Sequence, residues 1–181
     1  MKKAIFILTL IATTGSLFAQ KKTTTSATVS FDASTAIDNL PKANNKTVIA
    51  AIDTKTGTMQ FEANVKNFAF SNPSMQQHFN GERWLHSDQH PTFTFKGNIV
   101  DMSTINFAKD GSYKTEVEGT LTIKGKGQKV KVPGTIVVNG SNLTTTANFS
   151  IALADYGITG TAIDGGKVSK NPKITVTADF K

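Results

Sequence analysis

Apolar and polar residues alternate at every second position over most of this chain. The pattern is clearest in residues 113–123, where Val117, Leu121 and Ile123 alternate with charged and hydroxyl-bearing side chains. Period-two alternation indicates a β-strand with one buried face, because successive side chains point to opposite sides of a sheet. The same pattern predicts strands over residues 27–31, 48–52, 59–65, 93–99, 113–123, 130–138, 143–153 and 174–180.

Turn residues separate these predicted strands at short intervals. Clusters rich in Gly, Asp, Asn and Ser occur at residues 53–57, 109–111, 125–127 and 139–142. Short connections of this kind join antiparallel neighbours. The sequence therefore predicts an all-β fold, an antiparallel barrel or sandwich of about eight strands.

One short helix is predicted over residues 73–81. Asn72 is a favourable N-cap and Pro73 suits the first helical position. Gly81 is expected to end the helix in a left-handed conformation. Such a segment cannot pair in the sheet and must bury its apolar face, which carries Phe79. We therefore expect it to lie over the mouth of a barrel.

Three glycines interrupt the inward-facing phase of the predicted strands: Gly97, Gly119 and Gly134. Glycine inside a strand marks a bend, a bulge or a close approach of two backbones. Closing a sheet into a barrel requires bends of this kind. Glycine also leaves volume unfilled, so strand curvature and space for a ligand are both open interpretations.

Residues 1–19 have the pattern of a secretory signal peptide. Lys2 and Lys3 precede an apolar run, and Ala19 ends a stretch of small residues before Gln20. The apolar run is shorter than the roughly 20 residues that a membrane span needs. We therefore predict cleavage near Ala19, export to the periplasm or the medium, and one mature domain over residues 20–181.

Composition and charge exclude some classes of function. The chain has 181 residues and no cysteine, so an exported form cannot depend on disulfides. Its formal charge of +7 falls to +5 once Lys2 and Lys3 are removed with the signal. The densest basic cluster, in residues 124–131, has no interleaved aromatics and is interpreted as a solvated hairpin. No nucleic-acid partner is expected.

The histidines are the strongest candidates for chemistry. His78, His86 and His90 lie near Asp88, and such side chains can bind zinc. Their spacing matches no recognised ligand motif, so capping and hydrogen bonding are the favoured interpretation. Ser87 lacks the Gly-x-Ser-x-Gly turn of a nucleophile. We expect no enzymatic activity, no metal site and no cofactor.

Apolar residues form the remaining candidate site. A small barrel can fill its interior with side chains or hold one small ligand. The aromatic alternation alone does not decide between a packed core and a cavity.

Several segments resemble the YceI-like family. They are residues 78–80, 84–88 and 90–97, then 117–125 with 129–133, and finally 155–158. The resemblance covers nearly all of residues 20–181, and the motifs occur in the family's order. It implies a secreted or periplasmic, lipocalin-like barrel that encloses a polyisoprenoid chain, including quinone-type lipids.

The residues and the resemblance together predict an exported protein that binds an apolar chain-like molecule: an isoprenoid, a quinone or a fatty-acid-like lipid. The alternative is a structural or stress-related barrel with a filled core and no ligand. Whether the protein forms a homodimer is left open. The residues expected to line the pocket are Phe68, Phe70, Met75, Phe79, Trp84, Phe93, Phe95, Gly119, Leu121, Phe149, Ile151 and Tyr156.

Overall fold

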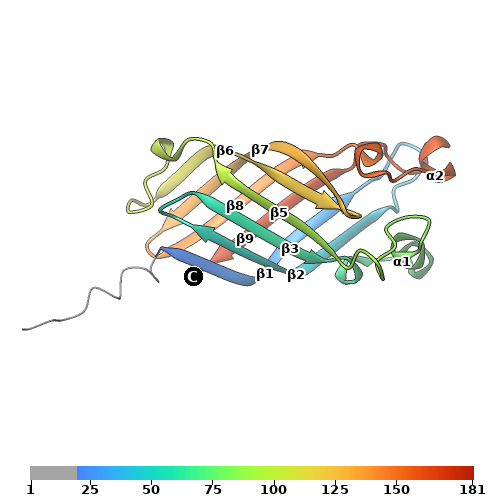
Figure 1. The fold of residues 1–181 in the computed structure, drawn as a ribbon, viewed down its shortest axis with the longest axis horizontal. Coiled ribbons are helices and arrows are strands. Elements are labelled where there is room, and N and C mark those ends of the chain that lie inside the picture. The colour runs from blue at the N-terminus through green and yellow to red at the C-terminus, as the bar shows by residue number, and fades with distance from the viewer. Residues whose placement is uncertain (1–19) are drawn as a thin grey trace, which may run out of the picture.

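Alternating strands close into one antiparallel barrel in the computed structural model, which describes residues 20–181 (Figure 1). The predicted signal peptide, residues 1–19, lies outside the described residues. The strands are β1 (Lys21–Asp32), β2 (Lys42–Asp53), β3 (Thr58–Asn64), β4 (Ala69–Phe70), β5 (Thr92–Ile99), β6 (Gly111–Ile123), β7 (Lys126–Asn139), β8 (Asn142–Ser150) and β9 (Lys173–Phe180).

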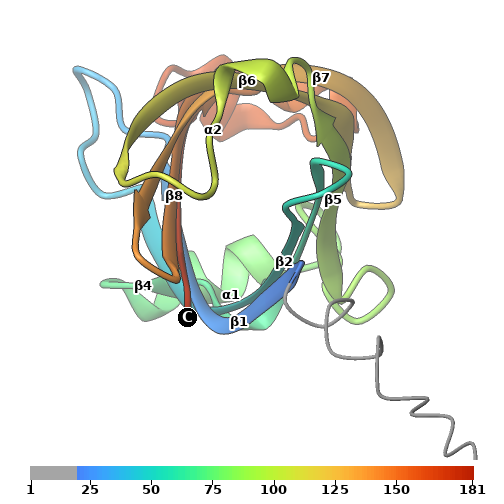
Figure 2. The same cartoon turned by 90° about the vertical axis from the view of Figure 1, so that its left-hand side faces the viewer.

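The sheet closes because its first and second strands pair with each other. The strand order is β1-β9-β8-β7-β6-β5-β3-β2-β4, and β1 also pairs with β2. The view along the barrel shows the resulting ring (Figure 2). The two-residue β4 is an extra strand beside β2. The predicted all-β, lipocalin-like antiparallel barrel of about eight strands is confirmed.

Short helices lie at both ends of the barrel. Beside α1 (Pro73–Asn80) and α2 (Thr161–Asp164), the chain forms the 3-10 helices η1 (Val65–Asn67), η2 (Met102–Thr104) and η3 (Leu153–Tyr156). Helices α1 and α2 lie at the end opposite the C-terminus (Figure 1). Within residues 20–181, no helix combines the length and apolar character needed to cross a bilayer.

Helix α1 begins as predicted and ends differently. The Asn72 side chain accepts hydrogen bonds from the backbone N–H groups of Ser74 and Met75. The predicted left-handed cap at Gly81 is wrong, because Gly81 is extended, with φ of −68°. Its carbonyl accepts from the N–H of His86, at 2.9 Å, so the chain folds directly back after the helix.

Helix α1 covers its end of the barrel through Phe79. This side chain is only 4% exposed, and its ring centroid lies 5.9 Å from that of Phe31 on β1 and 5.8 Å from that of Phe68. A helix residue thus packs against a barrel strand at the end of the interior. Trp84, just beyond the helix, adds a further ring 6.3 Å from Phe79.

The first two strands are longer than the alternation predicted. Residues 21–24 of β1 pair with residues 50–53 of β2, and the register shifts on either side of Ala27. The added part of β1 is rich in Lys and Thr and carries no apolar signal. Conversely, β3 ends at Asn64 and β8 at Ser150, each earlier than predicted.

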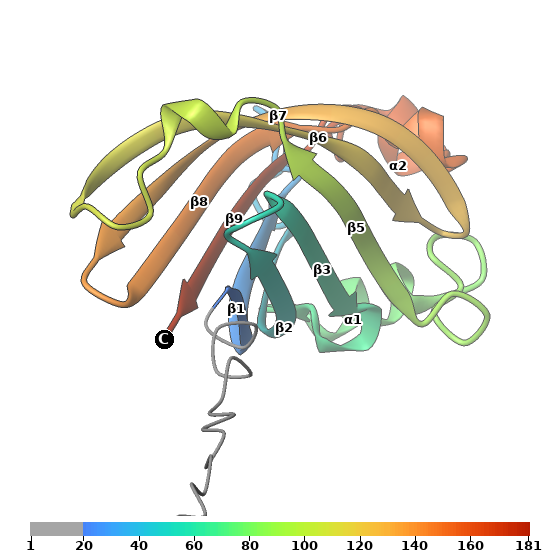
Figure 3. The ribbon, with the colours of Figure 1, turned by 60° about the vertical axis from the view of Figure 1, so that its left-hand side comes forward.

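The β6–β7 hairpin turns one position earlier than predicted. Lys124 and Gly125 both have positive φ, +50° and +72°, and β7 starts at Lys126. Two successive positive φ values are characteristic of the type I′ turn, whose twist matches that of paired strands. The long β6 and β7 strands then curve together over one side of the barrel (Figure 3).

Candidate functional site: an apolar lumen

The barrel interior contains a cavity of about 140 Å³. A single water needs roughly 10–15 Å³ on the same scale, so the space admits on the order of ten water-sized groups. Every strand of the closed barrel contributes to its wall. One residue from each strand, in chain order from β1 to β9, is Val29, Val48, Phe61, Phe95, Leu121, Ile136, Phe149 and Ile174.

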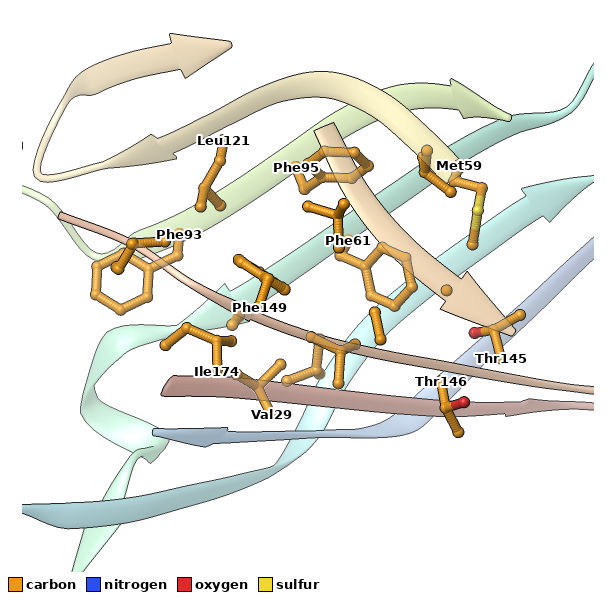
Figure 4. Close-up of a pocket in the computed structure, with 18 of the residues that line it drawn as sticks. Val29, Met59, Phe61, Phe93, Phe95, Leu121, Thr145, Thr146, Phe149 and Ile174 are labelled. Atoms are coloured by element: carbon orange, nitrogen blue, oxygen red, sulfur yellow. The ribbon is translucent and has the colours of Figure 1, made fainter. Parts of the chain in front are cut away.

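Strand register brings the lining side chains together. Phe61 on β3 is the partner of Phe95 on β5, which is in turn the partner of Leu121 on β6. Directly opposed residues point to the same face of a sheet, so all three enter the lumen. The rings of Phe61 and Phe95 are 6.5 Å apart, and Figure 4 shows both facing Phe149 across the space.

The wall of the lumen is not packed like the ends of the barrel. Ile52 and Phe180 are fully buried, whereas Phe61, Phe95 and Leu121 are only partly buried although they sit inside the barrel. Protein interiors are otherwise close-packed, with few voids larger than a water molecule. The partial exposure therefore marks apolar surface that no neighbouring side chain covers.

A second, smaller cavity of about 50 Å³ lies beneath α1. Phe31, Phe68, Phe79 and Trp84 contribute to its wall. These aromatic side chains come from β1, the segment after η1, helix α1 and the segment after α1. The helix thus supplies part of an aromatic wall at this end of the interior.

The walls carry no ionisable side chain among the described residues. The hydrogen-bonding groups are threonine hydroxyls in the larger cavity, as at Thr145 and Thr146, and the Trp84 indole in the smaller one. Charged ligand groups would therefore enter without a partner, at high desolvation cost. The lumen suits an uncharged, largely apolar molecule.

Eight of the twelve predicted lining residues border one of these cavities. Phe93, Phe95, Leu121, Phe149 and Ile151 line the larger one. Phe68, Phe79 and Trp84 line the smaller one, together with Phe93 and Ile151. Four others, Phe70, Met75, Gly119 and Tyr156, lie elsewhere.

Three of these four are side chains that line neither cavity. The Phe70 ring on β4 packs at a tilted angle against that of Phe79, which lines the smaller cavity, with ring centroids 4.8 Å apart. Met75 is half-buried in the first turn of α1. Tyr156 is buried within η3, where burial and then the charge of Asp155 raise the pKa of its hydroxyl.

Gly119 does not open space for a ligand. Its paired residue on β5 is Gly97. A Cβ atom at Gly119 would lie 2.6 Å from the Gly97 Cα atom and 2.8 Å from Cζ of Phe95. The Phe95 ring and the neighbouring backbone already occupy that volume, so the ligand-space interpretation of this glycine is wrong. Gly134, by contrast, does border the larger cavity.

Several lining residues were absent from the predicted site although their strands were predicted. Val29, Met59, Phe61, Val117 and Ile174 all occupy the inward phase of the alternation. That phase is the signal that could have identified them. Sequence alone does not show which inward positions meet a packed neighbour and which meet the cavity.

The three histidines do not converge on one point. His78 is exposed on α1, and the rings of His86 and His90 meet edge-on with centroids 6.4 Å apart. Over residues 20–181, no three side chains of His, Cys, Asp or Glu are placed to hold a metal ion. Asp88 instead pairs with Lys66 at 2.6 Å, which lowers the pKa of its carboxyl group.

A closed antiparallel barrel with an apolar lumen and a helix at one end places this protein among the lipocalin-like barrels. Residues 12–180 match the family model of the YceI-like domain. The protein therefore belongs to the YceI-like family. No curated protein matches the sequence.

Solved structures share this fold. BcnA from Burkholderia cenocepacia has 24% identity and a TM-score of 0.70, over 84% of this chain and 95% of that chain. A polyisoprenoid-binding domain from Saccharophagus degradans, implicated in plant cell wall breakdown, has 13% identity and a TM-score of 0.74, over 90% and 98%. The YceI protein of Campylobacter jejuni has 17% identity and a TM-score of 0.54, over 79% and 84%. At these identities the likeness concerns the fold.

Proposed function

We propose that this protein is an exported, non-enzymatic carrier that holds an apolar chain-like molecule in its lumen. The observation that carries the proposal is the cavity of about 140 Å³, whose described wall is apolar apart from threonine hydroxyls. The ligand class is an isoprenoid, a quinone or a fatty-acid-like lipid. Membership of the YceI-like family and the polyisoprenoid-binding neighbour support this class.

Burial of a hydrocarbon chain supplies the binding energy. Each methylene moved from water into an apolar site contributes about 0.8 kcal/mol. A chain of about ten carbons would contribute on the order of 8 kcal/mol, before the cost of its lost translational and rotational freedom. The lumen can bind such a chain without any charged partner.

Export completes the proposed role. The basic and apolar pattern of residues 1–19, ending at Ala19, supports removal of a signal peptide and release to the periplasm or the medium. An apolar molecule has little solubility in these aqueous compartments, so a barrel that covers it would keep it in solution. The mature domain would begin near Gln20.

Native mass spectrometry of wild type and two matched variants tests the proposal. Ala147 faces the larger cavity, and Ser150 is exposed on the outer face of the same strand. Ala147→Leu fills part of the lumen, whereas Ser150→Leu adds the same side chain outside it. We expect an apolar adduct on wild type and on Ser150→Leu, and a reduced adduct on folded Ala147→Leu.

The competing account is a structural barrel whose interior needs no ligand. A bare protein mass for wild type, when it is purified from a host that exports it and then exposed to isoprenoid alcohols, would favour that account. An adduct of equal abundance on all three proteins would place the ligand outside the lumen and contradict the proposal.

A further inference from the structure

The two cavities are separated by a ring of side chains that border both of them. The ring consists of Val29 on β1, Phe93 on β5, Ile123 on β6, Ile151 after β8 and Ile174 on β9. We propose that this ring sets the maximum length of chain that the protein accepts. The inference rests on the proposed function and adds to it a determinant of ligand length.

The ring lies at one end of the larger cavity. In Figure 4, Phe93 stands at one extreme of the lining side chains, while Met59 and Thr145 stand at the other. A chain that occupies this cavity lengthwise therefore meets Phe93 at the α1 end. Ile123 and Ile151, at 6% and 8% exposure, are buried beside it and leave little freedom to widen the passage.

Aromatic packing holds Phe93 in place. Its ring lies 5.7 Å from that of Phe68, which lies 5.8 Å from that of Phe79 on α1. Tilted ring pairs at these distances are favourable contacts. The Phe93 ring is thus supported on the side of helix α1. A bound chain would contact it from the other side, that of the larger cavity.

The space beyond the ring is small but usable. The cavity of about 50 Å³ beneath α1 corresponds to about four water-sized groups. Removal of the Phe93 ring would connect this space to the larger cavity. The accepted chain should then lengthen by about four carbons.

A series of straight-chain primary alcohols of increasing length measures this limit. For wild type, the affinity should rise about fourfold with each methylene, the equivalent of the transfer free energy of that group, until the chain reaches the ring. Beyond that length, added methylenes should give no further gain. Isothermal titration calorimetry on the mature protein gives the length at which the affinity stops rising.

Phe93→Ala is the test variant and Phe61→Ala is its matched control. Phe61 lines the larger cavity and does not border the smaller one. Both changes remove one ring from the lumen, but only Phe93→Ala opens the passage. We expect the limiting length to increase by about four carbons in Phe93→Ala, with at least tenfold tighter binding of the longest alcohols, and to stay unchanged in Phe61→Ala.

The outcomes separate this inference from the proposed function. If wild type binds the alcohols but both variants have the same limit, the ring does not determine length and only this inference fails. If wild type binds no alcohol of any length, the proposed function and the inference both fail. Should Phe93→Ala not fold, Phe93→Leu takes its place, because leucine also replaces the ring by a smaller side chain. The inference then requires that the limiting chain length increase in Phe93→Leu.

Discussion

Gly97 and Gly119 face each other across β5 and β6, and the ring of Phe95 covers them both. A Cβ atom on Gly97 would come within 2.6 Å of the Phe95 Cζ atom, and one on Gly119 within 2.8 Å. The two backbones approach more closely than any pair with side chains would allow. Aromatic cover of a strand glycine is a known means of stabilising such a site.

Gly119→Ala should destabilise the barrel. Its added methyl group would lie against the Lys96 carbonyl oxygen of the adjacent strand, so the two strands would have to separate. Overpacking of this kind costs about 1–3 kcal/mol. Denaturant unfolding of the variant should show a loss of free energy of unfolding in this range.

Gly134→Ala is the control for this change. A Cβ atom there would meet only the Thr146 carbonyl oxygen, at 3.2 Å. The loss of free energy of unfolding should therefore be smaller in Gly134→Ala than in Gly119→Ala. Equal losses of free energy of unfolding in the two variants would show that the close backbone approach at Gly119 does not cause the destabilisation.

Asn45→Ala should also destabilise the fold, for a different reason. Asn45 is fully buried on β2, where its Nδ2 donates to the Asn64 carbonyl at 2.9 Å and its Oδ1 accepts from the Thr47 N–H at 2.9 Å. Removing the amide leaves buried backbone groups without partners, which costs about 1–3 kcal/mol. Thermal or denaturant unfolding measures the loss.

Asn148→Ala is the matched surface change. The exposed Asn148 side chain accepts a hydrogen bond from the Thr175 hydroxyl, at 2.7 Å, where water can replace it. The expected change in the free energy of unfolding is below about 0.5 kcal/mol. A comparable loss in both asparagine variants would contradict the role assigned to burial at Asn45.

Ligand binding should be nearly independent of pH and salt. No described residue on the wall of either cavity has an ionisable side chain, so protonation changes no contact with the ligand. Titration of the mature protein with an uncharged isoprenoid alcohol should give the same dissociation constant at mildly acidic and mildly alkaline pH. A change of tenfold or more across that interval would indicate a charged group at the site.

The β2–β3 turn should contribute a pH-dependent part of the stability. The Asp53 carboxylate accepts from the backbone N–H groups of Thr56 and Lys55, and these bonds lower the pKa of Asp53. A carboxyl group with a lowered pKa in the folded state stabilises the fold above its unfolded value, about 3.9, and loses this contribution as the pH falls through the folded value.

Asp53→Asn tests that contribution, because the amide keeps one acceptor oxygen but cannot ionise. Wild type should be more stable than this variant at neutral pH, and the difference should shrink below about pH 4. Denaturant midpoints at the two pH values give the comparison. If the stability difference between wild type and Asp53→Asn stays constant with pH, the ionised Asp53 carboxylate does not stabilise the fold.

Alternation was sufficient to predict the barrel because most inward residues of this closed sheet are apolar. It did not predict residues 42–46 of β2, where the buried Asn45 replaces an apolar residue. The Gly81 cap was missed because the segment after α1 hydrogen-bonds back to it, a tertiary effect. The strand pattern marked Phe61 and Phe95 as inward, but only their packing shows that both border a cavity.

The proposed carrier role requires that the lumen between Phe93 and Met59 hold a chain-like apolar molecule. The most direct measurement is a crystal structure of the mature protein purified from a host that exports it. We predict continuous elongated density along the lumen, in contact with Phe61, Phe95 and Phe149 and ending at Phe93. A lumen closed by rearranged side chains, with no density between them, would contradict the account.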